Sequence, residues 1–132
     1  MNTSDRGSTT VEWAIWSVPA IIAIIGLLQL AMWWVARDVS ITAAQQGLTA
    51  GRVLGGTPAD ASAAARKFVT RAGGMASDFT VSTAGTTDAV MRVDVSATVV
   101  QVVQIPRLTW RIQQTAAGAR ERFTTPTVST RP

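Results

Sequence analysis

The chain has 132 residues, a net charge of +4 and only 15% charged side chains, against roughly 25% in an average soluble domain. This length allows one modest domain, or a membrane segment with a small domain attached. Cysteine and histidine are both absent, which excludes disulfide bonds, thiol chemistry, and any catalysis or metal binding that depends on either side chain.

The shortage of charge is concentrated in one segment. Residues 13–36 carry no charged side chain over 24 positions, and a transmembrane helix needs roughly 20. A buried core helix would be less uniformly apolar, and the apolar part of a cleaved secretory signal spans only about 7–15 residues. Trp13 and Trp16 stand at one end and Trp33 and Trp34 at the other, so roughly 30 Å of helix separates two aromatic borders. The sequence therefore predicts a helix that spans a membrane once.

Three residues inside this segment are unusual for a bare membrane anchor. Pro19 removes one helical hydrogen bond and predicts a kink, which membrane helices tolerate. Gly26 leaves a notch in the helix surface, and the amide of Gln29 favours a polar partner on a neighbouring helix. We therefore expect packing against other helices through Gly26 and Gln29.

The residues that lead into the apolar segment resemble the start of a type IV pilin-like precursor. They are Gly7, Glu12 five positions later, the adjacent Trp13, and then Pro19. Within that superfamily the chain is most similar to TadE-like minor pilins of tight-adherence (Tad, Flp-type) pilus systems, which also carry a stretch of small residues after the membrane helix. That stretch is matched here by Ala43, Ala44, Gly47, Ala50 and Arg52.

The resemblance, which covers residues 6–52, implies how the chain would be processed and where it would act. A prepilin peptidase would cut between Gly7 and Ser8 and remove a leader, residues 1–7. Residues 8–36 would then span the cytoplasmic membrane, with the C-terminal head outside it, and the subunit could also accompany the pilus. Its partners would be other pilin-like subunits, the Tad pilus assembly machinery, the peptidase and the lipid bilayer.

Glu12 has a physical rationale that does not depend on the family. A carboxylate at the bilayer centre costs roughly 2.5–3.5 kcal/mol on insertion scales, so even at the membrane edge it needs a favourable neighbour. Cleavage would place the amine of Ser8 one helical turn away, and a helix N-terminus also favours negative charge. We assign Glu12, with Trp13 and Pro19, to subunit register and assembly. The alternative is an ordinary first-turn glutamate, favoured by the helix dipole alone.

Beyond the membrane segment the sequence predicts a head of the α+β class, residues 37–123. The first helix continues over 37–55, where small apolar residues recur at helical spacing. The resulting stripe is Ala36, Val39, Ala43, Gly47, Ala50 and Leu54. A short second helix begins with Thr57 as N-cap and Pro58 as first residue, and ends at Gly73-Gly74. Its expected apolar face is Ala61, Ala65, Phe68 and Ala72.

From residue 78 onward the apolar pattern alternates, as in strands. We expect strands over 79–83, 91–99 and, after Pro106, 107–113, with a turn over 84–88. The third strand would direct Leu108, Trp110 and Ile112 to one face. The predicted fold is a long N-terminal helix, transmembrane in its first half, with a short second helix and a small antiparallel sheet. Residues 124–132 are expected to form a loose tail.

Groups that support catalysis are not brought together by the sequence pattern. Lys67 is the one lysine, the acidic residues are scattered without metal-ligand spacing, and no phosphate-binding glycine loop precedes a helix. We therefore expect no enzyme activity, no cofactor and no metal site.

One further reading competes with the pilin-like one. A signal-anchored envelope protein could use a basic head to bind a partner, and nucleic acid is one candidate for it. The bases that would serve are Arg107, Arg111, Arg120 and Arg122. By alternation Trp110 would lie on the face opposite to Arg107 and Arg111, where it cannot stack on a bound base. We therefore do not expect nucleic acid to be a partner.

Overall fold

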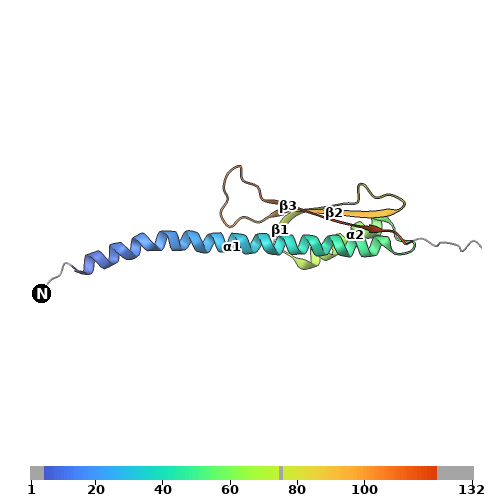
Figure 1. Ribbon diagram of the computed structural model, residues 1–132. Coiled ribbons are helices and arrows are strands. Elements are labelled where there is room, and N and C mark those ends of the chain that lie inside the picture. Colours follow the sequence, from blue (N-terminus) through green and yellow to red (C-terminus); the bar gives the residue numbers. More distant parts are fainter. Residues whose placement is uncertain (1–4, 75, 122–132) are drawn as a thin grey trace, which may run out of the picture.

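The computed structural model describes residues 5–74 and 76–121, which form a long stalk with a small head along one end (Figure 1). The first helix, α1 (Asp5–Arg52), has 48 residues and is roughly 72 Å long at the usual rise. It is followed by α2 (Pro58–Ala72), β1 (Ala76–Ser82), β2 (Val90–Val99) and β3 (Arg111–Ala119). The three strands form one antiparallel sheet in the order β1-β2-β3. This confirms the predicted α+β class.

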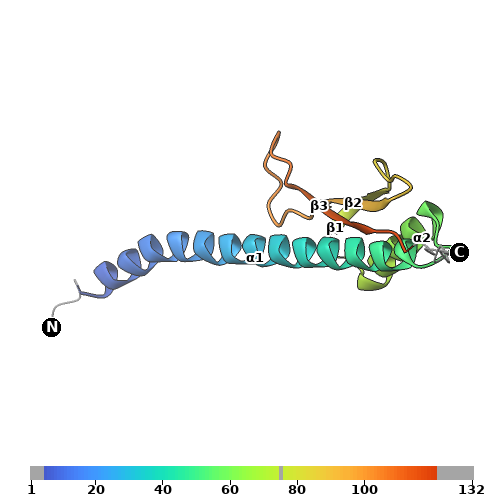
Figure 2. The ribbon, with the colours of Figure 1, turned by 45° about the vertical axis from the view of Figure 1, so that its right-hand side comes forward.

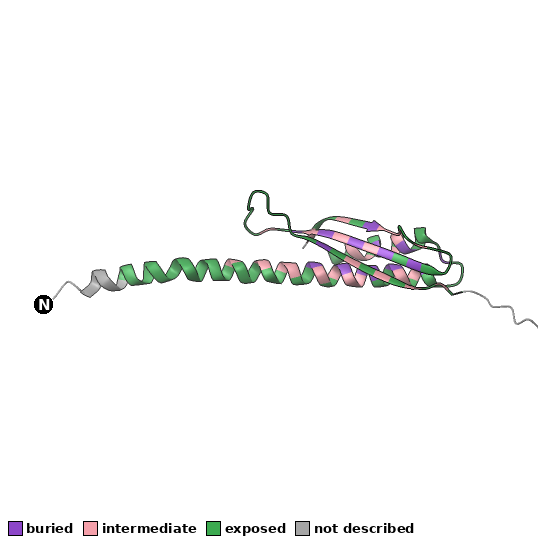
Figure 3. Cartoon of the chain, turned by 45° about the horizontal axis from the view of Figure 1, so that its top comes forward, coloured by how far each residue is buried: buried purple, intermediate pink, exposed green. Residues whose placement is uncertain are grey.

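The N-terminal half of α1 stands apart from the head. In both ribbon views the sheet and α2 lie along the C-terminal half of the helix, and the blue turns extend beyond them (Figures 1 and 2). Burial follows the same division, because every residue from 10 to 24 is exposed and the first buried one after Thr10 is Ala36 (Figure 3). An 18-residue window of this helix has a mean hydropathy of 2.1 and no buried residue. The helix is therefore long and apolar enough to cross a membrane.

Pro19 lies inside α1 without ending it. The deep-blue turns at the start of the helix bend away from the axis of the remainder in both ribbon views (Figures 1 and 2). A bend in this part of the helix is the expected effect of proline, whose ring displaces a preceding carbonyl and removes a hydrogen bond.

The core lies between the inner face of the sheet and the two helices. Its centre is β2, in which alternate residues are buried, as the sequence predicted: Met91, Val93, Val95, Ala97 and Val99. Ala61 and Ala65 of α2 are completely buried, and Phe68 is packed against the same cluster. Nearer the membrane segment, Val99 and Ile112 pack on Ala36. The hydrophobic residues of the helices that are fully buried are therefore alanines, whereas most of those on the sheet are larger.

The buried stripe of α1 differs in part from the predicted one. Leu54 is exposed because α1 ends at Arg52, and Val39 and Ala50 are only half-buried. Ser40, Ala44 and Gly51, which were not expected in the stripe, are buried. The buried hydroxyl of Ser40 donates to the carbonyl oxygen of Ala36 at 2.8 Å, which satisfies it within the helix. A polar residue could therefore occupy the core face without a partner from the sheet.

Two glycines allow α2 and β2 to rest directly on the backbone of α1. A Cβ atom at Gly47 would lie 2.8 Å from the carbonyl oxygen of Ala61 and 3.1 Å from Cγ1 of Val93. At Gly51 it would lie 2.7 Å from Cβ of Ala61 and 2.8 Å from Cε of Met91. Contacts this short do not occur in packed proteins, so both positions require glycine for this approach.

The third strand is displaced from its predicted position, residues 107–113. Residues 107–110 belong to the preceding loop, because Pro106 and the positive φ of Arg107, 70°, interrupt the extended backbone. Farther along, β3 approaches α1 through small residues, and a Cβ at Gly118 would lie 3.4 Å from Leu48. The expected apolar face of Leu108, Trp110 and Ile112 was wrong, since of these only Ile112 lies in the strand and is buried.

The remaining differences from expectation are small. β1 begins before the predicted residue 79 and has an irregularity between Ser77 and Thr80, where Asp78 has a φ of 54°. Ala72, expected on the apolar face of α2, is exposed at its last position. The expected leader, residues 1–7, is described only from Asp5, and the expected tail, residues 124–132, lies outside the described residues.

Two carboxylates of the head have lowered pKa values. The carboxylate of Asp60 accepts hydrogen bonds from the hydroxyl and the backbone N–H of Thr57, and these lower its pKa from 3.8. The second of these bonds and the bond from the Asp60 N–H to the Thr57 hydroxyl form the capping box of α2. For Asp94, burial acts to raise the pKa, but hydrogen bonds from Thr115 and Arg92 and the charge of Arg92 outweigh it and lower the pKa. Both groups therefore favour the ionised form in the folded chain.

We expect the head to lose stability in acid through Asp60 and Asp94. A lowered folded-state pKa gives stabilisation that is complete above the unfolded value, 3.8, and is lost as the pH falls through the folded pKa. The double variant Asp60→Asn, Asp94→Asn should unfold at a lower urea concentration than the parent at neutral pH, and the gap should shrink below pH 3.8. Urea midpoints of the full chain in detergent measure this, with Asp38→Asn as control. A gap that is constant across this pH range would contradict the prediction.

Candidate functional site

The residues predicted to act in processing and assembly lie at the free end of α1. Gly7 and Ser8 are in its first turns, and Glu12 and Trp13 follow on the same continuous helix. Positions 8 and 12 are separated by one helical turn and share a face. Glu12, Trp13 and Trp16 border a shallow surface hollow, and all three side chains are exposed. They are therefore accessible to lipid or to another subunit.

Large apolar side chains cover the helix between this end and the head. The exposed ones are Val11, Trp13, Ile15, Trp16, Val18, Ile21, Ile22, Ile24, Leu27, Leu28, Leu30, Trp34 and Val35. An exposed apolar surface of this extent is typical of contact with a membrane or with another protein.

Aromatic residues and an arginine lie where the apolar segment meets the head. The rings of Trp33 and Trp34 meet edge to face with centroids 6.1 Å apart, and the guanidinium of Arg37 lies 5.9 Å from the centroid of the Trp34 ring. Tryptophan and arginine are the residues found at a membrane border. If α1 crosses a bilayer, the position of this cluster therefore marks where the border on the side of the head would lie.

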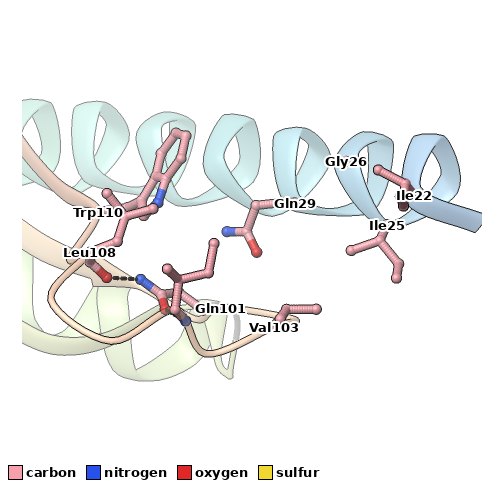
Figure 4. Close-up of a pocket in the computed structure, with 9 residues that line it drawn as sticks. Ile22, Ile25, Gly26, Gln29, Gln101, Val103, Leu108 and Trp110 are labelled. Atoms are coloured by element: carbon pink, nitrogen blue, oxygen red, sulfur yellow. Dashed lines mark hydrogen bonds between the residues drawn. The ribbon is translucent and has the colours of Figure 1, made fainter. Parts of the chain in front are cut away.

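Gln29 was expected to bind another helix, and the structure gives it a partner within its own chain. Its Nε2 donates to the carbonyl oxygen of Val100 at 3.4 Å, and the backbone N–H of Val102 donates to its Oε1 at 2.9 Å. Gly26, one turn earlier, has open space where a Cβ would stand. Gly26 and Gln29 both line a surface groove between α1 and the segment after β2 (Figure 4). The amide of Gln29 is therefore satisfied without a second helix.

The partner of Gln29 is the β2–β3 loop, residues 100–110, which sequence reasoning missed. Gln101 organises this loop from inside: its Nε2 donates to the carbonyl oxygen of Leu108 (Figure 4), and the N–H of Ile105 donates to its Oε1 at 3.4 Å. The available signal was Pro106, because proline lacks the backbone N–H that bonds to a neighbouring strand and therefore favours a loop around its position.

The arginines considered as a basic patch are spread over the described part of the head. Arg111 and Arg120 stand at opposite ends of β3, roughly 30 Å apart at the usual rise of a strand. The guanidinium of Arg120 donates to the carbonyl oxygen of Gly56 at 2.7 Å, so it fastens the turn between α1 and α2. Arg107 lies in the β2–β3 loop, and Arg122 lies outside the described residues. The three described arginines thus form no common surface.

The residues of the family resemblance, 6–52, lie on one unbroken helix. Comparison of the chain with protein-family models, with curated proteins and with solved structures gives no match. The resemblance of residues 6–52 to TadE-like minor pilins stays a prediction from the sequence.

Proposed function

We propose that this chain is a minor pilin-like, TadE-like membrane subunit that takes part in assembling a Tad-type pilus. The observation that carries the proposal is the placement of Gly7, Glu12, Trp13 and Pro19. These residues lie on the first turns of a 48-residue helix whose other end holds a folded head, and Glu12, Trp13 and Pro19 are exposed. A plain membrane anchor has no need for a carboxylate at this position, and the proposed cleavage supplies an amine one turn from it.

The division of α1 into two halves suits a subunit whose N-terminal helix moves from lipid into contact with other helices. The clusters that hold the head together draw on α1 only from Met32 onward, so the earlier half contributes nothing to them. That half can exchange lipid for neighbouring helices while the head remains folded. A pair between the amine of Ser8 and the carboxylate of Glu12, within one chain or between two, would set the axial register during the exchange.

The proposal places the chain in the cytoplasmic membrane, crossing it once, with the head outside. Its partners are other pilin-like subunits and the assembly machinery of the pilus, and a prepilin peptidase acts on it first. Exposed apolar surface from Val11 to Leu30 supports contact with lipid and with other helices.

Cleavage between Gly7 and Ser8 is the first test of the proposal. When the chain is produced together with a prepilin peptidase, N-terminal sequencing of the membrane-resident protein should begin at Ser8. Without the peptidase the same preparation should retain the leader. The variant Gly7→Val, which changes only the residue before the cut, should retain it in both cases. An intact mass that still includes residues 1–7 in the presence of an active peptidase would disprove processing.

A further inference from the structure

The β2–β3 loop is unusually apolar for a surface loop. Six of its eleven residues have large apolar side chains, none of them buried: Val100, Val102, Val103, Ile105, Leu108 and Trp110. Their exposed fractions run from 39% to 54%. Connecting loops favour Gly, Pro, Asn, Asp and Ser, and of these the loop contains only Pro106. Its side chains are therefore better suited to an apolar environment than to water.

The loop lies beside the part of α1 that is apolar enough to span a membrane. It projects past the end of the sheet toward the N-terminal half of the helix (Figures 1 and 2). Ile22, Ile25, Gly26 and Gln29 line a groove together with loop residues (Figure 4). These positions precede Trp33 by 4 to 11 residues, or roughly 6–16 Å along the helix axis. Because one leaflet contributes about 15 Å of hydrocarbon, a bilayer with its border at Trp33 would surround the loop.

Hydrogen bonds within the chain prepare the loop backbone for surroundings with little water. Gln29 bonds the carbonyl of Val100 and the N–H of Val102, and Gln101 bonds the carbonyl of Leu108 and the N–H of Ile105. The N–H of Leu108 donates to the carbonyl oxygen of Ile105 at 3.1 Å. Backbone groups left without partners are costly in hydrocarbon, so these bonds lower the cost of inserting the loop.

Arg107 limits how deep the loop can lie. A charged side chain at the bilayer centre costs roughly 2.5–3.5 kcal/mol, whereas near the border its apolar stem can stay in hydrocarbon while the guanidinium reaches lipid phosphates. Arg107 is exposed in the turn between the apolar residues Ile105 and Leu108. This arrangement favours the outer part of a leaflet over the midplane.

We propose that the β2–β3 loop inserts into the head-side leaflet of the same bilayer that α1 spans and holds the head against the membrane surface. This rests on the membrane-spanning role of α1 in the proposed function. The loop lies at the same level as the exposed apolar face of α1 from Ile22 to Leu30. Lipid that surrounds this face would therefore surround the loop as well. The role of Gln29 is then to clamp the loop along the helix.

Depth-dependent fluorescence quenching tests the insertion directly, and the absence of cysteine makes labelling simple. A polarity-sensitive dye would be attached to Val103→Cys in the full chain, reconstituted in phospholipid vesicles. Leu28→Cys reports on the helix, and Ala84→Cys reports on the turn at the other end of the sheet. Because Val103 and Leu28 lie at one level in the outer part of the leaflet, we expect lipids brominated near the headgroup to quench the dyes at 103 and at 28, and to do so more strongly than lipids brominated at the chain end. Aqueous iodide should quench only the dye at 84.

Three outcomes would overturn the proposal, each in a different way. Iodide quenching at 103 with lipid quenching retained at 28 would leave the membrane span intact and place the loop in water. Protection at 103 from both quenchers would show that protein, such as the helix of a second copy, covers the loop. Absence of lipid quenching at 28 would remove the membrane span, and with it the membrane part of the proposed function.

The clamp can be tested in the same vesicles. Gln29→Leu removes both hydrogen bonds to the loop but leaves the helix apolar. We expect it to reduce lipid quenching at 103 and admit iodide there, without changing the dye at 28. Gln46→Leu, on the exposed face of α1 beyond the loop, is the matched control. Unchanged quenching at 103 in Gln29→Leu would show that Gln29 does not hold the loop in the membrane.

Discussion

Gly47→Ala is expected to destabilise the head by about 1–3 kcal/mol, the cost of overpacking a core, although alanine is the better helix former. The new methyl group would lie 2.8 Å from the carbonyl oxygen of Ala61 and 3.1 Å from both Cβ of Ala65 and Cγ1 of Val93. A backbone carbonyl cannot rotate away as a side chain can, so α2 as a whole must shift from α1. That shift would also open the contacts of α2 with the sheet.

Gly26→Ala provides a matched control on the same helix. Nothing lies within 4 Å of a Cβ at Gly26, so this substitution should gain helix propensity without a clash. Both variants would be unfolded in urea in detergent, and trypsin cleavage at Arg66 and Lys67 of α2 would report the midpoint. A Gly47→Ala midpoint equal to that of Gly26→Ala would show that the two helices are not packed this closely.

Glu12→Gln is expected to abolish pilus assembly while the protein is still made and inserted. Glutamine has nearly the shape of glutamate, so the helix and the exposed tryptophans around it should persist. The charge that would pair with the amine of Ser8 is lost, and with it the register between subunits. The head should be unaffected, because Glu12 is exposed and 20 positions before Met32, where the core clusters begin.

Assembly would be measured by counting filaments and by recovering crosslinked subunits from membranes of the host cell. Asp38→Asn is the matched control, since it removes an exposed carboxylate from the same helix beyond the membrane segment. Normal filaments and normal subunit contacts in Glu12→Gln would favour the reading as an envelope protein with a partner-binding head. Loss of the protein from the membrane would instead show a role for Glu12 in insertion.

Periodicity was sufficient to predict the helices and the central strand. The uniform apolar run of α1 and the Thr57-Pro58 start of α2 are local signals, and both elements formed where expected. β2 carries a clear alternation because one of its faces is buried and the other is in water. In each case the signal for the helix or strand lies in the residues of that segment.

The position of β3 could not be predicted in this way, because it depends on contacts with α1. Residues 113–119 are small or polar and show weak alternation, yet Ala116 packs against the core cluster and Gly118 lies beside Leu48 of α1. The apolar alternation from Leu108 to Ile112 resembles that of a strand, but its first part belongs to the β2–β3 loop, so it led to a wrong strand position. The partner of Gln29 was missed because residues 107–110 were assigned to a strand and not to a loop. A glutamine that binds a loop 71 positions away also leaves no local pattern in the sequence.

The described chain is tied back at its end to the place where α1 stops. The N–H of Glu121 donates to the carbonyl oxygen of Arg52 at 2.9 Å, and Arg120 bonds the turn beside it. Glu121 therefore lies roughly 22 Å beyond Arg37, at the end of α1 opposite its apolar half. In the proposed arrangement, a label joined to the chain at Glu121 would begin at the pole of the head farthest from the bilayer.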